Sequence, residues 1–182
     1  ISFTTVDASG SAIGDAGEYN TGRSFGPSMA FDPDTSQFIL CFADTLNSER
    51  ATIRIRTVSG TTLTFGDKIE VHSHNNGHTT GCYYDTAKDR LIVVFMSSSV
   101  GRNGIYAKGF KLNSSRGVDG TGSITTVDEA SSGYNQTNAG NFGEINRNDE
   151  NGNSMVDVCY EDGDDSSHNY VRTVMLDDHT NA

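Results

Sequence analysis

Three of the chain's five histidines lie close together, at His72, His74 and His78. On a β-strand, His72 and His74 would point to the same side, because successive side chains alternate between the two faces. His78 could return toward them across the turn that Asn76-Gly77 predicts. Neutral imidazoles in this arrangement can bind zinc, copper or nickel. No cysteine accompanies the cluster, so the sequence favours the alternative, a solvated polar loop.

Two aspartates, Asp44 and Asp162, follow the last aromatic residue of two similar apolar segments. A pair of carboxylates a few ångströms apart could carry out glycosidase chemistry. In the alternative, each aspartate caps a loop through hydrogen bonds from its side chain to the backbone. The middle copy of the segment has Ser97 at this place. The missing acid favours the capping role.

The acidic run around Asp162 and Asp164, like the polar segment 146–153, is rich in the hard oxygen ligands that calcium prefers. Bound calcium would also relieve the repulsion that a net charge of −11 implies. Neither stretch has the spacing of an EF-hand, and solvated acidic turns are the alternative. The sequence thus predicts no cofactor other than structural calcium.

Aromatic rings near loops could stack on sugars. Tryptophan, a common platform for such stacking, is absent from the chain. There is also no phosphate-binding glycine loop and no nucleophile elbow, so we expect no enzyme. The candidate ligand-binding rings are Tyr19, Tyr83, Tyr106, Tyr134 and Tyr170.

Short β-strands must position these residues, because no window of ten or more residues has helical periodicity. One pattern recurs at 31–42, at 84–95 and, more loosely, at 145–160: a strand, an Asp-rich tight turn, and an apolar strand that ends in an aromatic residue. In the first copy, Pro33 presets φ for the turn and Asp32 is expected to accept hydrogen bonds from the backbone two residues on. The pattern predicts antiparallel hairpins.

The remaining strands complete three cycles of four strands each. Tight turns are predicted at Ser59-Gly60 and at Asn103-Gly104, where both central residues would need a positive φ. We expect a single all-β domain over 1–182, with repeats of approximately 1–62, 63–122 and 123–182, because one such sheet cannot bury its own faces. Strands are predicted at 1–6, 28–31, 37–42, 51–58, 63–71, 79–84, 91–95, 104–112, 123–127, 141–145, 155–160 and 170–176.

The three cysteines, Cys41, Cys82 and Cys159, are too far apart for a zinc motif and cannot all pair within the chain. Cys41 and Cys159 each precede the last aromatic of the repeated strand, where the middle copy has Val94. We therefore expect these cysteines to act as small buried apolar residues.

The net charge of −11 argues against nucleic-acid binding and against attraction to anionic membranes, because both require clustered Lys and Arg. No apolar run is long enough to span a bilayer, so no membrane insertion is expected. An acidic surface rich in Gly, Ser, Thr and Asn instead suits an extracellular or virion-surface protein.

The repeated unit resembles a β-propeller blade. More narrowly, Phe31-Asp32-Pro33, the stretch 57–61 and Phe65-Gly66 are similar to the degenerate repeats of phage tail-fibre and marine bacterial surface proteins. Propellers have about four to eight blades, so the resemblance implies completion by a second copy or by a longer polypeptide. A β-trefoil or β-prism is the alternative with three repeats.

The resemblance implies a non-catalytic structural or adhesion module of a virion fibre or cell surface. Its expected partners are other copies of itself, other virion or surface proteins, or glycans. A propeller-type or three-fold lectin is the second hypothesis, and a glycosidase that uses Asp44 and Asp162 is the third.

Overall fold

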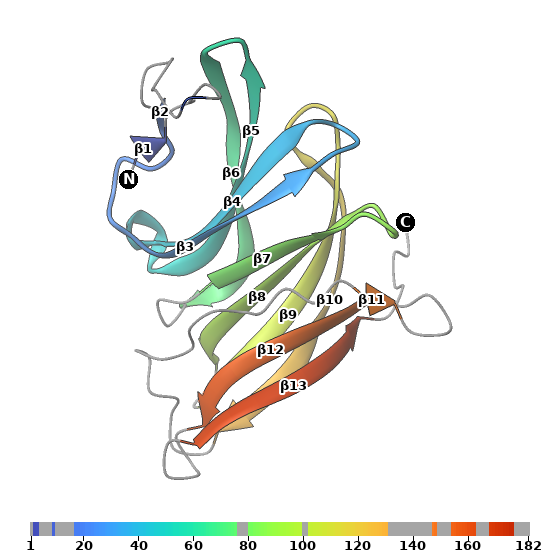
Figure 1. Ribbon diagram of the computed structural model, residues 1–182. Coiled ribbons are helices and arrows are strands. Elements are labelled where there is room, and N and C mark those ends of the chain that lie inside the picture. The colour runs from blue at the N-terminus through green and yellow to red at the C-terminus, as the bar shows by residue number, and fades with distance from the viewer. Residues whose placement is uncertain are drawn as a thin grey trace.

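The computed structural model describes residues 2–3, 9, 17–75, 80–99, 102–130, 147–148, 154–162 and 168–176 (Figure 1). Within these ranges the protein is all β, apart from one 3-10 turn, η1 (Thr45–Asn47). No helix in them has the length and apolar character needed to cross a bilayer. The predicted strand at 141–145 lies outside the described residues. The strands are β1 (Ser2–Phe3), β2 (Gly17–Glu18), β3 (Ser24–Asp32), β4 (Gln37–Asp44), β5 (Arg50–Ser59), β6 (Thr62–Asn75), β7 (Thr80–Asp85), β8 (Arg90–Ser99), β9 (Arg102–Leu112), β10 (Val118–Ala130), β11 (Arg147–Asn148), β12 (Ser154–Asp162) and β13 (His168–Leu176).

Three antiparallel sheets follow one another along the chain, and strands that are consecutive in sequence are neighbours within each sheet. The first sheet contains β3–β6, the second β7–β10 and the third β11–β13, while β1 pairs with β2. The second sheet lies between the other two (Figure 1). The predicted all-β antiparallel architecture is therefore confirmed, with four strands in each of the first two sheets and three described strands in the third.

The strands are grouped differently from the predicted repeats of 1–62, 63–122 and 123–182. The strand β6, which was expected to open the second repeat, pairs with β5 as the fourth strand of the first sheet. The predicted turn at Ser59-Gly60 explains this pairing: it joins β5 to β6 as a tight hairpin, with Gly60 at a φ of +58°. Likewise, β10 pairs with β9 and completes the second sheet.

The two Asp-rich turns are built in the same way. Asp32 accepts hydrogen bonds from the N–H groups of Asp34 (2.9 Å) and Thr35 (3.3 Å), as its position before Pro33 predicts. In the second sheet, Asp85 accepts equivalent bonds from the N–H groups two and three residues later. Each turn ends in a left-handed residue, so the two sheets can be aligned residue by residue from Asp32 and Asp85.

The second sheet buries both of its faces, because alternate side chains of β8 contact opposite neighbours. We call the face of the second sheet that meets the first sheet its N-side face, and the opposite one its C-side face. The equivalent faces of the first and third sheets take the same names. On the N-side face, Leu91, Val93 and Phe95 pack against Ile39, Cys41, Ile53 and Ile55 of the first sheet. On the C-side face, Ile92, Val94 and Met96 pack in one cluster with Val156 and Val158 of the third sheet.

Polar contacts also link the sheets. Gln37 Nε2 of the first sheet donates to the carbonyl oxygen of Asn113 in the second sheet, at 2.9 Å. In return, Lys108 Nζ donates to the carbonyl oxygen of Val71 at 3.0 Å. Arg172 of the third sheet pairs with Asp128 of the second sheet at 3.1 Å. The Nε2 of the buried Gln37 thereby keeps a hydrogen-bond partner across the interface.

The N-side face of the first sheet is covered only in part. Leu40 and Phe42 are buried there, and the ring of Tyr19 packs edge-on against Phe42 with centroids 4.8 Å apart. Farther along the same face, Met29 and Phe31 are exposed. Over the described residues, the three sheets are not closed into a ring.

The predicted hairpin turn at Asn103-Gly104 is wrong. Both residues lie within β9, where they pair with Ser98 and Ser97 of β8. The glycine has a packing role instead, because a Cβ at Gly104 would lie 2.5 Å from the hydroxyl oxygen of Tyr106.

Candidate functional site

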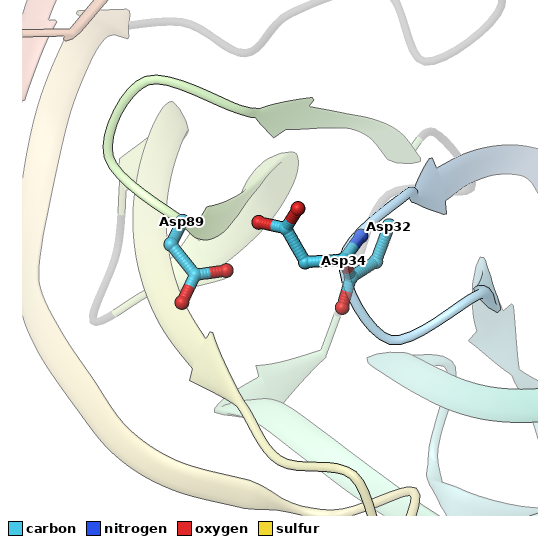
Figure 2. A group of neighbouring side chains, drawn as sticks. All are labelled: Asp32, Asp34 and Asp89. Carbon is cyan, nitrogen blue, oxygen red and sulfur yellow. The ribbon is translucent and has the colours of Figure 1, made fainter.

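Within the described part of the chain, three acidic side chains from the two equivalent turns come close together. Asp32 and Asp34 belong to the β3–β4 turn and Asp89 to the β7–β8 turn (Figure 2). One carboxylate oxygen from each residue lies within 4.8 Å of the others. Asp32 is buried, whereas Asp34 and Asp89 are exposed at the edge of the interface between the first two sheets. Such a group offers oxygen ligands of the type that calcium prefers.

Hydrogen bonds already engage two of these three carboxylates. Asp32 accepts from its own turn, including the hydroxyl of Thr35, and Asp89 accepts from the hydroxyl of Tyr84. Burial raises the pKa of Tyr84, and the hydrogen bond to Asp89 and the charge of Asp32 raise that pKa further. The phenol therefore remains a hydrogen-bond donor at neutral pH. Its contacts join the two turns across the interface.

A second polar network surrounds Asp44, at the end of β4. Its carboxylate accepts hydrogen bonds from Lys68 Nζ at 2.7 Å, from Asn20 Nδ2 at 2.9 Å and from the N–H of Leu46 at 3.0 Å. Lys68 Nζ also donates to Asn20 Oδ1 at 2.7 Å. Asp44 thus caps η1 and ties β6 and the segment before β3 to the end of β4.

The electrostatics of Asp44 suit this structural role. Burial acts to raise its pKa, but the hydrogen bonds from Lys68, Asn20 and Leu46 outweigh burial and hold the pKa below the usual range. A catalytic general acid needs a raised pKa so that it holds its proton near neutral pH. Asp44 is instead a paired carboxylate, and the predicted capping role is confirmed by its bond to Leu46.

The other predicted metal and acid positions are placed only in part. The ring of His72 lies beside Phe95, with centroids 5.7 Å apart. His74 is in β6 and Asp162 is in β12, but the described features of these two residues stop at the backbone. His78 and Asp164 lie outside the described residues. The proposed pairing of Asp44 with Asp162, and the histidine site, therefore remain predictions.

The predicted sugar-stacking tyrosines have different environments. Tyr170 is 37% exposed on β13, and Tyr83 is half-buried against the cluster between the second and third sheets. Tyr106 is buried with its ring 6.0 Å from that of Phe95, and Tyr19 is buried against Phe42. The expected exposure of Tyr19 and Tyr106 is wrong, because both rings fill the interior. Tyr134 lies outside the described residues.

Comparison of the chain with protein-family models, with curated proteins and with solved structures finds no match. Its function must therefore be argued from its own residues.

The sequence interpretation missed the group formed by Asp32, Asp34, Tyr84 and Asp89. In sequence, Asp89 stands in the second turn where Ser36 stands in the first, and the structure gives both residues a positive φ. Sequence could place Asp89 at the end of a turn. It could not place that turn against Asp34, because this proximity depends on how the two sheets stack.

Proposed function

We propose that the chain is a non-catalytic structural and adhesion module of a virion fibre or cell surface, built from propeller-type sheets. The observation that carries this proposal is the burial of both faces of the second sheet by neighbouring sheets of the same kind. Such a unit gains its interior by stacking, as repeat proteins do. Stacking of this kind produces extended, rigid surfaces rather than a closed pocket.

The use of the described charged groups supports a structural role. Asp32 and Asp85 shape turns, Asp44 caps η1 beside Lys68, and Arg172 links two sheets. The acidic, polar composition supports an extracellular or virion-surface location, and copies of the chain or other surface proteins are the proposed partners. The role requires no cofactor, and structural calcium near Asp162 and Asp164 remains a prediction from sequence.

Surface location is tested with antibodies against the purified chain. We expect immunogold label on intact virions or intact cells of the organism that encodes it. Label that appears only after the cells are permeabilised would refute the location.

For the non-catalytic role, the purified protein is incubated with a panel of glycosides beside its Asp44→Asn variant. Turnover that the substitution abolishes would overturn this part of the proposal.

A carbohydrate-binding role is the second candidate, and the exposed ring of Tyr170 on β13 favours it. Stacking on an aromatic ring is a common mode of sugar recognition. A glycan array probed with the wild-type protein and with Tyr170→Ala tests this candidate. Binding that the wild type has and the variant lacks would support the lectin role, whereas equal signals would remove Tyr170 from it.

A further inference from the structure

Both ends of the stack present apolar side chains to solvent. On the N-side face of the first sheet, Met29 is 50% exposed and Phe31 is 45% exposed, and the ring of Phe31 lies 4.8 Å from that of the half-buried Phe38. On the C-side face of the third sheet, Val171 is 68% exposed beside the half-buried Cys159, with which it pairs across β12 and β13.

The alignment of the two turns shows what covers such positions inside the stack. Counted back from Asp32 and Asp85, Phe31 corresponds to Tyr84 and Met29 corresponds to Cys82. Tyr84 is only 5% exposed because it packs against the first sheet. Cys82 also faces the first sheet, where its Sγ accepts from Ser28 Oγ at 3.4 Å. Phe31 and Met29 therefore occupy interface positions that no sheet among the described residues covers.

The same reasoning applies at the other end. Cys159 pairs with Val171 as Cys41 pairs with Ile53 in the first sheet and as Val94 pairs with Ala107 in the second. Those four equivalent residues are buried, because another sheet covers the C-side face of each of the first two sheets. In the corresponding pair of the third sheet, Val171 is 68% exposed, and no described sheet covers it.

We infer that the N-side face of the first sheet binds the C-side face of the third sheet in a second copy of this chain, head to tail. The two faces carry the two halves of the interface that the chain already forms internally, so the contact continues an existing packing mode. Each face also carries one mostly buried charge, and the two are of opposite sign: Arg56 stacks over Phe38 on the first face, and Asp157 lies beside Cys159 on the second. The inference deepens the proposed function, since it names the partner of the structural module.

A head-to-tail contact either closes a ring or continues as a filament. Two copies joined at both ends would bring six sheets together, which is within the range of about four to eight that propellers use. A ring and a filament require the same contact, between the N-side face that carries Phe31 and the C-side face that carries Val171. The test therefore concerns this contact and not the final number of copies.

Complementary end variants test the contact. Phe31→Asp disables the first-sheet face and Val171→Asp disables the third-sheet face, and both positions are exposed, so each monomer should fold. By native mass spectrometry we expect the wild type to associate and each variant alone to be monomeric. An equimolar mixture of the two variants should form a heterodimer, because one intact face of each kind remains. Leu46→Asp, at a residue 64% exposed and at the opposite end of β4 from Phe31, should associate as the wild type does.

A cross-link tests the residue-level alignment. At the internal interface the thiols of Cys41 and Cys82 contact each other. The equivalent contact between copies joins Cys159 of one copy to position 29 of the next. Met29→Cys should therefore form disulfide-linked dimers or longer chains under mild oxidation, and Met29→Cys with Cys159→Ser should not. Leu46→Cys is the matched control and should remain unlinked.

A wild-type protein that stays monomeric at about 100 μM, or a variant mixture that fails to pair, would overturn the inference. So would a Met29→Cys cross-link that persists without Cys159. Circular dichroism spectra of the variants identify any that are misfolded, and the cross-linking result then decides. A monomeric chain that still labels on intact virions or cells would refute this contact alone and leave the proposed function standing.

Discussion

Replacement of buried valines by alanine on the two faces of β8 tests the stacking directly. Val93 faces the first sheet and Val94 faces the third, and both are buried. Val171 provides a matched control, because it is also a strand valine but is mostly exposed. All three substitutions are made in the Phe31→Asp chain, so that association between copies does not contribute to the free energy of unfolding.

The expected cost follows from the methyl groups that lose their contacts. Truncation of valine to alanine removes two methylene equivalents, each worth about 0.8 kcal/mol of transfer free energy. The cavity that remains adds to this, and the total is about 2–3 kcal/mol. For a chain of this size the cost corresponds to a fall in Tm of about 5–10 °C. Val171→Ala should change the free energy of unfolding by no more than about 0.5 kcal/mol.

Urea unfolding followed by circular dichroism measures these differences. The reasoning requires that Val93→Ala and Val94→Ala both destabilise by similar amounts. If Val94→Ala were as mild as Val171→Ala while Val93→Ala remained costly, the third sheet would not cover the second in solution. The stack would then consist of two sheets, and the proposed interface on the third sheet would have no basis.

Three further predictions concern titratable groups. Asp44→Asn should cost about 2–3 kcal/mol at pH 7, because it removes the partner of Lys68. The pKa of Asp44 is lower in the folded state than in the unfolded state. Its contribution to the free energy of unfolding is therefore complete above the unfolded-state pKa of about 4 and is lost as pH falls through the folded-state pKa. A stability difference between Asp44→Asn and wild type that stays constant from pH 7 to pH 2 in urea titrations would contradict this. The raised pKa of Tyr84 predicts that its phenol ionises above the ordinary tyrosine value of about 10 in an absorbance titration, a step that is missing in Tyr84→Phe, and that stability falls as pH rises above that value. Burial raises the pKa of Cys41, so mass mapping after maleimide treatment of the folded Phe31→Asp protein, which does not associate, should find Cys159 modified and Cys41 intact at pH 8 until denaturant is added.

Local chemistry made much of the strand order predictable. Asp32 and Pro33 specify a turn through one side chain and one fixed φ, and Gly60 specifies the next tight turn. Where the prediction failed, distant contacts decided the outcome. Asn103-Gly104 has the composition of a hairpin turn, but the glycine makes room for the ring of Tyr106 and lies within a strand.

Burial was harder to predict than strand position. Tyr19 lies between Glu18 and Asn20 in sequence, and Tyr106 lies just after the predicted turn at Asn103-Gly104. Nothing local indicates that the two tyrosine rings would be buried against Phe42 and Phe95. The assignment of strands to sheets also depended on pairing. From sequence alone, β6 could be the first strand of one sheet or the last strand of another, and its register with β5 decides between them. The group around Asp89 was invisible for the same reason, because it requires two sheets to meet.

One position of the repeat links the fold to the proposed assembly. Cys41, Val94 and Cys159 are small apolar residues at the same place in three successive sheets, each just before the last aromatic of its strand. In the first two sheets a covering neighbour explains this choice of residue, because Cys41 and Val94 are buried in interfaces. A solvated sheet face would not require Cys159 and Val171 to be apolar, since the side chains of an exposed C-side face could all be polar. Cys159 and Val171 are therefore residue types of a covered position, and a second copy of the chain carries the face that fits them.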